Sequence, residues 1–430
     1  MTTPTFPCDL VVVGGGAAGF FAAIQAKTVR PQLSVVLLEA APKPLGKVRI
    51  SGGGRCNVTH ACFDPEALTH YYPRGFRELR SVFQRFSPAD TCLWFESRGV
   101  PLKTEPDGRI FPQSDQSESI IQCLLQEAER RQIRLFVQHP VQQVNALASG
   151  GFEVHCPNRV FTSHSVVLAT GGKAPPLSWL QQMGHPIEAQ VPSLFTFEIA
   201  DPAVRQLSGL SVPNVTARLE VSGRKPIEQA GPLLFTHWGL SGPVILKLSA
   251  WGARILHENQ YRANLKVDFT PDHTENHLLE KLLQNKEAHP KQQIGNTPLF
   301  SLPKRLWALH LQAAHISLAT PCNALSRQKL LSLCSQLKKA SFQISGKGVF
   351  KEEFVSAGGV CLKEVAFKTM ESRQVPGLFL AGEILDIDGL TGGFNFQNAW
   401  STGFIAGHSA AEYCLKRATS PTRSTHGEAT

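Results

Sequence analysis

The stretch from Val11 to Gly19, VVVGGGAAG, limits most strongly what this chain can fold into. It predicts a buried strand that runs directly into a G-x-G-x-x-G turn at Gly14, Gly16 and Gly19, followed by an apolar helix. A second strand, SVVLLE, ends in Glu39, which lies 20 residues after Gly19. This order of strand, glycine turn, helix, strand and acid is the βαβ fingerprint of a dinucleotide-binding domain.

Each glycine of the turn has its own physical reason. Gly14 allows the tight turn, Gly16 lets a pyrophosphate approach the backbone, and Gly19 lets helix and strand pack closely. The helix N-terminus offers unpaired N–H groups and a partial positive charge to the phosphates. Glu39 is placed to accept hydrogen bonds from an adenosine ribose and would repel the 2′-phosphate of NADP. At this point NAD and FAD both remain open.

Length and composition fit a globular enzyme. The chain has 430 residues, which is too many for one core, and 42% of them are hydrophobic. No run of about 18 apolar residues occurs, so we expect no membrane span. The N-terminus MTTPTFPCDL lacks the regions of a signal peptide. The ten cysteines are scattered without a C-x-x-C pair, so we expect free thiols, no metal site and a cytoplasmic location.

Local signals give a coarse order of elements. A hairpin is expected around the turn Pro106-Asp107-Gly108, and a helix from about Ser117 to Arg131, capped by a serine. From about Pro192, short alternating segments predict a small antiparallel sheet or barrel. A basic helical stretch is expected from about His273 to Phe342. After it, α/β character returns at VFKEEFVSAGGV.

We therefore predict an α/β fold in which a Rossmann-like dinucleotide-binding domain is split by an insertion. The first and second parts of this domain are expected at 1–190 and 345–415. Between them we expect an antiparallel β domain at 191–272 and a small basic helical domain at 273–344. Residues 416–430 are polar and without periodicity, which predicts a disordered tail.

The C-terminal part distinguishes FAD from NAD. LFLAG reads as a buried strand ending at Gly382, followed by Glu383, and a glycine-rich turn then opens an apolar helix from about Asn395 to Tyr413. A long cofactor needs this arrangement, because the distant acid can bind the ribityl hydroxyls. A second helix N-terminus can stabilise negative charge at flavin N1 and O2. The strand ending in ATGG at 169–172 also supports FAD. In proteins with two dinucleotide-binding domains, a strand ending in Ala-Thr-Gly marks where the chain leaves the FAD domain for an inserted one.

Taken together, these motifs resemble the bacterial FAD flavoproteins that carry the SGGGRCN signature. They are described as NAD(P)/FAD-dependent oxidoreductases or the aminoacetone oxidase family, and bile-acid dienone reductases are among their relatives. The resemblance covers nearly the whole chain and rests on GGGAAG (14–19), ISGGGRCNVT (50–59), ATGG (169–172), THWGLSGP (236–243), LPKRL (302–306), SAGGV (356–360) and AGEILDIDGLTGGFNFQNAWSTG (381–403).

The resemblance implies a split FAD domain, an inserted β-barrel-like domain and a small helical domain. The chain departs from the family pattern at His60, where Asn is commoner. It departs again at Phe394 and Asn398, in a stretch that more often reads Tyr-Asn-x-Gln-Trp. For this reason we do not transfer the substrate of any relative.

The resemblance also places the SGGGRCN loop against the flavin. Three successive glycines let the backbone lie close to a flat ring. Arg55 would supply a fixed positive charge for an anionic reduced flavin or substrate, and a structural ion pair is the alternative. Cys56 lacks a nearby partner cysteine and is expected to be a packed free thiol. His237, in a glycine-rich loop, is the candidate acid or base of the inserted domain, with a structural role as the alternative.

We predict an FAD-dependent oxidoreductase that transfers hydride at flavin N5 to or from an unidentified small organic substrate, for example an enone. NAD(P)H is a candidate transient electron donor that would enter the same cleft, because no second G-x-G-x-x-G occurs. The candidate catalytic residues are Arg55 and His237. The candidate cofactor-binding residues are Gly14, Gly15, Gly16, Ala17, Ala18, Gly19, Glu39, Ala40, Lys47, Ser51, Gly52, Gly53, Gly54, Arg55, Cys56, Asn57, Val141, Ala169, Thr170, Gly171, Gly382, Glu383, Gly392, Gly393, Phe394 and Asn395.

Two alternatives remain open. The whole chain has a formal net charge of +9, and residues 281–340 hold nine Lys and Arg against one acid, Glu287. This segment is either a solvated basic face or the docking face of a flavin-containing protein that binds nucleic acid. The other alternative is a plain NAD-dependent dehydrogenase.

Overall fold

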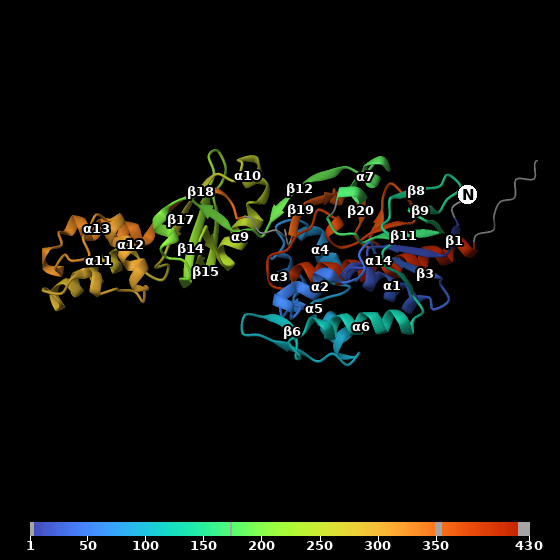
Figure 1. Cartoon of the computed structure of the whole chain (residues 1–430), viewed down its shortest axis with the longest axis horizontal. Coiled ribbons are helices and arrows are strands. Elements are labelled where there is room, and N and C mark those ends of the chain that lie inside the picture. Colours follow the sequence, from blue (N-terminus) through green and yellow to red (C-terminus); the bar gives the residue numbers. More distant parts are fainter. Residues whose placement is uncertain (1–3, 173, 349–354, 420–430) are drawn as a thin grey trace, which may run out of the picture. The chain divides into compact units, whose positions relative to one another are not determined.

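The structure is a computed structural model that describes residues 4–172, 174–348 and 355–419. The chain divides into two units, of which unit 1 comprises residues 1–190 and 356–430 and unit 2 comprises residues 191–355. The chain therefore leaves unit 1 once and returns to it after unit 2 (Figure 1). The finer division into domains that we expect from the sequence stays a prediction.

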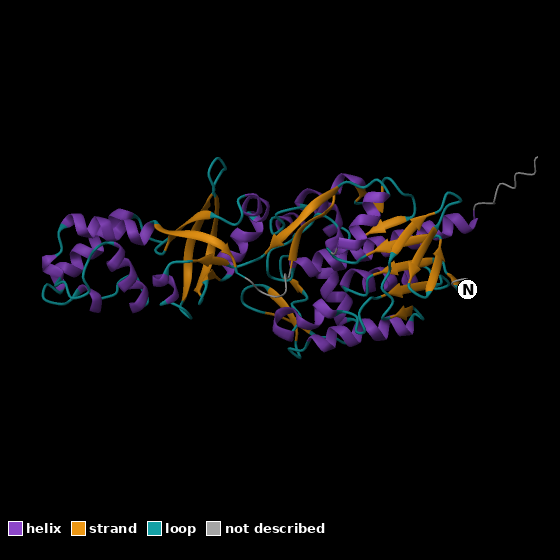
Figure 2. Ribbon diagram, turned by 45° about the horizontal axis from the view of Figure 1, so that its top comes forward, coloured by secondary structure: helices purple, strands orange, loops and turns teal. Residues whose placement is uncertain are grey.

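A seven-stranded sheet forms the centre of unit 1, in the order β20-β21-β22-β11-β2-β3-β7. Strands are drawn in orange in Figure 2. Strands β22, β11, β2, β3 and β7 are parallel, and the apolar runs of β2, β3 and β22 are fully buried. The chain order reverses at β2, which lies between β3 and β11, and open α/β sheets bind ligands beyond the strand ends at such a point. The strand bounds are β2 Leu10–Val13, β3 Val35–Leu38, β7 Arg134–Phe136, β11 Ser165–Leu168, β20 Val365–Ala366, β21 Glu371–Ser372 and β22 Leu378–Leu380.

Helices α1 (Ala17–Val29) and α14 (Phe394–Thr419) pack against each other, although they lie near opposite ends of the described chain. Two glycines of α14 make this approach close. An ideal Cβ at Gly403 would lie 2.4 Å from the carbonyl oxygen of Ala18, and one at Gly407 would lie 2.1 Å from that of Ala22. Side chains at these two positions would therefore force the helices apart.

The end of α14 corrects the sequence-based expectation of a tail from residue 416. The helix continues to Thr419, directly after a buried stripe that includes Ala410, Ala411 and Cys414. Lys416 and Arg417 in the last turn also favour a helix C-terminus, where positive charge is stabilised. The rest of the expected tail, residues 420–430, lies outside the described residues.

Smaller sheets and helices complete unit 1. The hairpin predicted around Asp107 is confirmed, because β5 and β6 pair antiparallel on either side of that turn. The helix predicted from Ser117 is also confirmed, but Ser117 does not cap it; its hydroxyl donates to the carbonyl oxygen of Arg49 instead. The bounds are β1 Thr5–Pro7, β4 Thr59–His60, β5 Leu102–Thr104, β6 Arg109–Pro112, β8 Gln143–Ala146, β9 Phe152–Cys156, β10 Arg159–Ser163, α2 Gly46–Ile50, α3 Pro65–Thr69, α4 Phe76–Phe83, α5 Pro88–Glu96, α6 Ser117–Arg130 and α7 Ala174–Gln182.

Unit 2 contains a closed six-stranded barrel in the order β13-β16-β15-β14-β17-β18. Strands β13 and β18 pair antiparallel and so close the barrel. Of the two alternatives from the sequence, a small antiparallel sheet or a barrel, the barrel is therefore correct. Strand β12 (Ile187–Ser193) instead pairs with β19 (Val355–Val360) outside the barrel. The barrel strands are β13 Phe197–Ile199, β14 Ser211–Glu220, β15 Ile227–Phe235, β16 Gly239–Ser241, β17 Ala263–Asp268 and β18 Ala340–Lys347.

Strand β18 corrects the expected end of the helical stretch. The sequence predicts helix as far as Phe342, but the chain is already extended at Ala340. Ala340, Phe342 and Ile344 are buried while the residues between them are exposed, and this period of two is that of a strand with one face on a core. Helix propensity in the preceding basic segment therefore does not extend into this strand.

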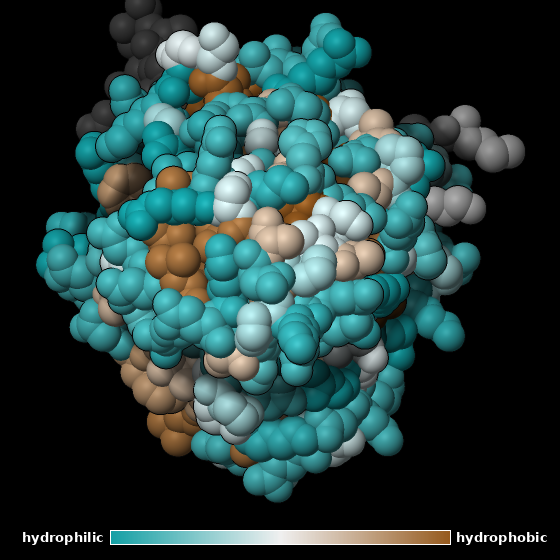
Figure 3. Space-filling view, turned by 90° about the vertical axis from the view of Figure 1, so that its left-hand side faces the viewer, coloured by the Kyte–Doolittle hydropathy of each residue, from teal (hydrophilic) through white to brown (hydrophobic). Residues whose placement is uncertain are grey.

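The helices of unit 2 pack on the barrel core, which they share through residues such as Leu306, Trp307 and Leu330. The outer surface around α11, α12 and α13 is mostly hydrophilic, with small hydrophobic patches (Figure 3). Throughout the described part of the chain, every helix is too short or too polar to cross a membrane. The helix bounds are α8 Pro202–Arg205, α9 Pro243–Trp251, α10 Ala253–Glu258, α11 Glu275–Ala288, α12 Lys304–Ala313 and α13 Arg327–Lys338.

Candidate functional site

The turn after β2 contains three glycines of the fingerprint. The packing of the protein itself requires glycine at two of these positions but not at the third. Gly14 has φ +109°, and an ideal Cβ there would lie 2.4 Å from the carbonyl oxygen of Ala169. A Cβ at Gly19 would lie 1.9 Å from the carbonyl oxygen of Gly14. Gly16 has φ −93°, which any residue adopts, and its ideal Cβ meets no atom within 4 Å. The open space at Gly16, at the N-terminus of α1, fits the approach of a pyrophosphate.

Glu39 follows β3 and lies beside this turn. Its carboxylate accepts hydrogen bonds from the backbone N–H groups of Gly15, at 2.8 Å, and Ala41, at 2.7 Å. The first turn of α1 holds no acidic residue and its N-cap residue makes no side-chain cap, so the helix N-terminus keeps its positive end for a ligand. Ala40 is exposed next to Glu39, and Val141 is half-buried in the loop before β8.

The SGGGRCN loop begins in the 3₁₀ turn η1 (Ser51–Gly54) directly after α2. Gly52, Gly53 and Gly54 all have positive φ, at 57°, 69° and 88°. An ideal Cβ at Gly53 or Gly54 would meet no atom within 4 Å, whereas one at Gly52 would lie 2.9 Å from the ring of Phe111. A run of three left-handed residues with open space beside two of them needs glycine, and it leaves backbone free to lie against a flat ligand.

Arg55 closes this loop and is engaged by the β5–β6 hairpin. Its guanidinium lies 2.6 Å from Glu105 and 3.5 Å from Asp115, and it stacks 4.0 Å from the ring centroid of Phe111. Asp115 also pairs with Lys103. The structural ion pair that the sequence left open is therefore present, and it fixes the loop to the hairpin.

Cys56 and Asn57, the last two residues of the SGGGRCN loop, have different environments. The Cys56 thiol is fully buried, and this burial raises its pKa to about 12, as expected for a packed thiol. In the orientation that satisfies both amide groups, Asn57 donates to the carbonyl oxygen of Thr59, at 3.0 Å, and accepts from the N–H of Gly393, at 2.9 Å. Asn57 therefore joins the SGGGRCN loop to the start of α14.

The start of α14 is built around glycines and one asparagine. Gly392 and Gly393 have φ of 130° and 94°, and an ideal Cβ at Gly393 would lie 2.6 Å from the carbonyl oxygen of Thr59. Asn395 accepts from the N–H of Gly389 and donates to its carbonyl oxygen, both at 2.8 Å. This turn is therefore held from within by Asn395.

Phe394 fixes the same helix start from the other side. Its carbonyl oxygen accepts a 2.6 Å hydrogen bond from the hydroxyl of Tyr72, and its ring stacks on Tyr71 and His60 at centroid distances of 4.3 and 4.8 Å. His60 Nε2 lies 3.1 Å from the carbonyl oxygen of Asp107, and burial lowers its pKa. The imidazole is thus neutral near pH 7.

Two strand ends meet beside the glycine turn. Strand β11 ends before Ala169 and Thr170, and β22 ends before Gly382 and Glu383, and these two strands are parallel neighbours. An ideal Cβ at Gly171 would lie 3.7 Å from a Glu383 carboxylate oxygen. Lys47, at the start of α2, forms an ion pair with Glu383. The structure thus brings the predicted residues of four distant segments of unit 1 to one edge of the sheet.

His237 belongs to unit 2 and is described within that unit. It is exposed, and its Nδ1 lies 3.1 Å from the hydroxyl of Ser208. The neighbouring Trp238 donates to the hydroxyl of Thr196 at 3.3 Å, which anchors the loop between β15 and β16. The catalytic roles of Arg55 and His237 stay predictions.

Three features escaped the sequence reading. Glu105 and Asp115, the partners of Arg55, lie 50 or more residues away in sequence, and no local signal couples them. A buried hydrogen-bond group joins Gln397 to the hydroxyls of Thr59, at 2.6 Å, and Thr91, at 3.0 Å. The third is His60, which the sequence marks only as a departure from the family pattern. It lies three residues after Asn57, the last residue of the SGGGRCN motif, and this short distance indicates that it lies near the site.

Residues 8–409 match the family model described as the HI0933-like protein Rossmann domain. The chain belongs to this family. The 3-dehydro-bile acid delta(4,6)-reductase of Clostridium scindens is 30% identical over 93% of this chain and 98% of that protein. The ribosomal RNA dihydrouridine synthase of Escherichia coli is 30% identical over 92% of this chain and 96% of that protein, and that of Haemophilus influenzae is 28% identical over the same shares.

Solved structures show the same fold. Quinol fumarate reductase of E. coli has a TM-score of 0.51 and 15% identity, with 97% of this chain and 72% of that chain covered. The 3-ketosteroid-delta4-(5alpha)-dehydrogenase of Rhodococcus jostii has a TM-score of 0.50 and 15% identity, with 94% and 97% covered. At 15% identity, this structural similarity is evidence for a shared fold and not for a shared function. By its family, the chain is an FAD-dependent oxidoreductase with a Rossmann-type FAD-binding domain.

Proposed function

We propose that the protein reduces a carbon–carbon double bond conjugated to a carbonyl group, with NAD(P)H as the electron donor. The observation that carries this proposal is that two differently named relatives, each matching more than 90% of both chains, share one reaction type. A delta(4,6)-reductase of a 3-oxo steroid acid saturates a double bond conjugated to the ketone. A dihydrouridine synthase saturates the 5,6 double bond of uracil, which is conjugated to the C4 carbonyl.

Unit 1 supplies the groups that would hold FAD. Gly16 and the N-terminus of α1 would take the pyrophosphate, and Glu39 would take the adenosine ribose. Glu383 lies at the adjacent strand end, where it would take the ribityl hydroxyls after release from Lys47. The glycines of η1 and the start of α14 would lie against the flavin ring. When bound, FAD supplies hydride transfer at N5 to the β-carbon of the double bond.

The chain must also deliver a proton to the α-carbon. We propose His237 for this role, because its imidazole is exposed and its Nδ1 lies 3.1 Å from the hydroxyl of Ser208, which can orient the ring. Arg55 is better suited to position the glycine loop than to meet an anion, since Glu105 and Asp115 share its charge. NAD(P)H would transfer its hydride to the flavin and leave before the substrate enters, because the sequence offers no second dinucleotide fingerprint.

Anaerobic stopped-flow spectroscopy tests this proposal. NADH or NADPH should bleach the flavin absorbance of the FAD-loaded protein, and an α,β-unsaturated ketone should then restore it while losing its own conjugated absorbance. A flavin that neither nicotinamide reduces would refute the choice of donor. A flavin that is reduced but transfers hydride to no conjugated alkene, including steroid dienones and uridine in RNA, would refute the reaction type.

A second candidate substrate is uridine within RNA, and the basic segment favours it. Lys281, Lys291, Lys304, Arg327 and Lys329 are all exposed. The remaining basic residues of the segment, of which Arg305 and Lys339 are also exposed, take part in hydrogen bonds or ion pairs. Lys338 lies 2.5 Å from Asp268 with a side chain only 15% exposed, and Lys339 pairs with Glu275.

Charge reversal at Arg327 and Lys329 decides between the two substrates. If RNA is the substrate, Arg327→Glu with Lys329→Glu should weaken RNA retention and reduce its dependence on salt concentration. The matched control is Lys338→Gln, which changes a lysine that faces Asp268 rather than solvent. RNA retention that is equally strong in the double variant, or absent at low salt in the unmodified protein, would exclude this candidate.

A further inference from the structure

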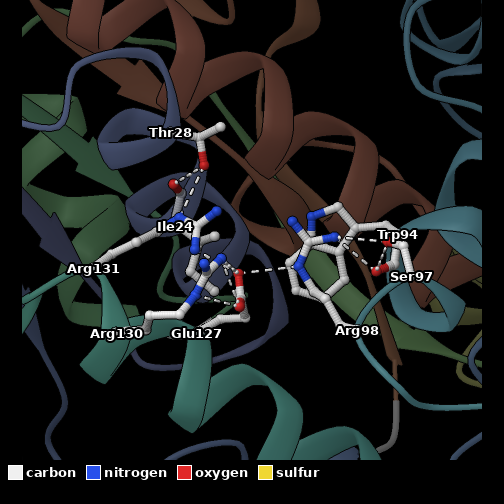
Figure 4. Close-up of polar contacts among 8 residues, drawn as sticks. All are labelled: Ile24, Thr28, Trp94, Ser97, Arg98, Glu127, Arg130 and Arg131. Atoms are coloured by element: carbon white, nitrogen blue, oxygen red, sulfur yellow. Dashed lines mark hydrogen bonds and ion pairs between the residues drawn. The ribbon is translucent and has the colours of Figure 1, made fainter.

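A second polar cluster in unit 1 lies where helices α1, α5 and α6 meet. It is centred on Glu127, whose side chain is 10% exposed. Three guanidinium groups approach this one carboxylate: Arg98 at 3.0 Å, Arg130 at 3.0 Å and Arg131 at 2.6 Å (Figure 4). Together the four side chains carry three positive charges and one negative charge.

The excess positive charge is only partly solvated. The side chains of Arg98 and Arg131 are 22% and 15% exposed, whereas that of Arg130 is 66% exposed. Burial lowers the pKa of Arg131, and the like charges of Arg130 and Arg98 add to this lowering against the attraction of Glu127. Holding uncompensated charge in a partly buried place is unfavourable unless a further anion is available.

The three arginines are held in place by hydrogen bonds, but one nitrogen of each guanidinium group makes none within the described residues. Arg98 donates from Nη1 to the carbonyl oxygen of Trp94, at 2.8 Å, and stacks 4.0 Å from its ring centroid. Arg131 donates from Nε to the hydroxyl of Thr28, at 3.0 Å. Within the described residues, Nη2 of Arg98, Nη1 of Arg130 and Nη2 of Arg131 make no hydrogen bond. These fixed donors need little further ordering to bind an anion.

A cavity of about 320 Å³ opens beside this cluster. Its size is at the lower end of small-molecule sites and is too small for a dinucleotide. Arg98 and Arg130 reach it together with a hydroxyl and an amide, both of which can hydrogen-bond phosphate oxygens. The lining residues are Ser97, Arg98, Cys123, Gln126, Glu127 and Arg130.

We propose that this cavity binds a phosphate group, either as inorganic phosphate or as part of a small phosphorylated metabolite. A phosphate monoester carries about −1.5 to −2 charges at pH 7, which matches the excess of the cluster. Its oxygens suit the planar donors of arginine, which bind phosphate in pairs. The ligand class is thus set by charge balance and unused donors, and no catalytic residue is involved.

Titration of the FAD-saturated protein with inorganic phosphate tests the proposal, because the saturated protein has its pyrophosphate site filled. The thermal midpoint should rise with phosphate concentration at constant ionic strength, with chloride as the reference salt. Arg130→Gln should weaken phosphate affinity about tenfold, the loss of one charge-assisted contact. Arg80→Gln is the matched control, since Arg80 is a similarly exposed arginine that pairs with Glu66 outside the cavity, and its variant should bind normally.

A second variant should change the phosphate affinity in the opposite direction. Glu127→Gln removes the competing carboxylate and should tighten phosphate binding if the variant folds. Adenosine 5′-monophosphate in a parallel titration separates the two sources, because tighter binding than phosphate indicates a phosphorylated metabolite and equal binding indicates free phosphate. A midpoint that phosphate does not raise, or that it raises equally in Arg130→Gln, would show that the arginines only neutralise the carbonyl ends of α5 and α6.

Discussion

The substitution Gly16→Ala tests whether the open space beside this residue is where FAD binds. The protein does not need that space for its own packing. The ideal Cβ at Gly16 meets no atom within 4 Å, and the backbone there is at φ −93°, so alanine fits without strain. Two neighbouring glycines provide matched controls. Alanine at Gly14 or Gly19 would place Cβ 2.4 Å or 1.9 Å from a backbone carbonyl oxygen.

The expected effect on stability is small. Alanine reduces the entropy of the unfolded chain, which stabilises by about 0.4–1 kcal/mol. Gly16 is also the N-cap of α1, where alanine is a poorer residue than glycine by about 0.5–1 kcal/mol. These two effects nearly cancel, so the free energy of unfolding of the apoprotein should change by less than about 1 kcal/mol. Gly19→Ala, in contrast, should cost about 1–3 kcal/mol or more, because backbone must move.

The effect on FAD binding should be much larger. A methyl group at Gly16 would occupy the approach of the pyrophosphate and remove at least one hydrogen bond from a backbone N–H to a charged oxygen. Such a bond contributes about 1.5–3 kcal/mol, so FAD affinity should fall roughly 10- to 150-fold. The prediction is thus a loss of cofactor affinity without a loss of fold.

Quenching of flavin fluorescence in a titration of the apoprotein gives the affinity, and thermal unfolding with and without FAD gives both stabilities. The reasoning fails if Gly16→Ala binds FAD as tightly as the unmodified protein, since the pyrophosphate would then not approach this residue. It also fails if the apoprotein of this variant unfolds as readily as that of Gly19→Ala.

Three further predictions rest on buried groups. Burial raises the pKa of Cys56 to about 12, so a thiol reagent at pH 8 should leave it unmodified in the native protein; peptide mass spectrometry that finds rapid labelling contradicts this. Burial lowers the pKa of His310 from 6.5 to about 4, so the unfolded chain takes up this proton first. The free energy of unfolding should therefore fall by roughly 3 kcal/mol between pH 6.5 and 4 in a urea titration, and His310→Leu should remove that component. Asp388→Asn leaves Arg74 without its fully buried partner and should cost about 3–5 kcal/mol in urea, whereas a cost below 1 kcal/mol would mean the pair is not buried in solution.

The parts of the fold that the sequence predicted are those set by local chemistry. The turn at Gly14 to Gly19 needs glycine for steric reasons that are visible in the sequence spacing, so the strand before it and the helix after it were predictable. The same holds for the turn at Asp107 and for the glycine-rich start of α14. In each case a small residue with an unusual backbone conformation marks the boundary between two periodic segments.

Contacts between distant segments were not predictable in the same way. Arg55 meets Glu105 and Asp115, and Lys47 meets Glu383, only because the sheet brings separate strand ends and loops together. A charge in a sequence does not indicate which opposite charge it will face. The sequence predicts the barrel but not its last strand, β18, because the short alternating pattern of this strand directly follows a long helical segment.

The packing of α1 against α14 has a consequence for the growing chain on the ribosome. Phe394 is 365 positions after Val29 (394 − 29), so at about 5–20 residues per second the partner of α1 is synthesised roughly 20 to 70 s later. During that interval the apolar surface of α1, including Phe21, whose ring packs on Trp400, lacks the helix that packs against it. Unit 2, which is continuous in sequence, is fully synthesised before this interval ends. We therefore expect the nascent protein to acquire its inserted unit first and to need chaperone protection of α1 until the last helix emerges.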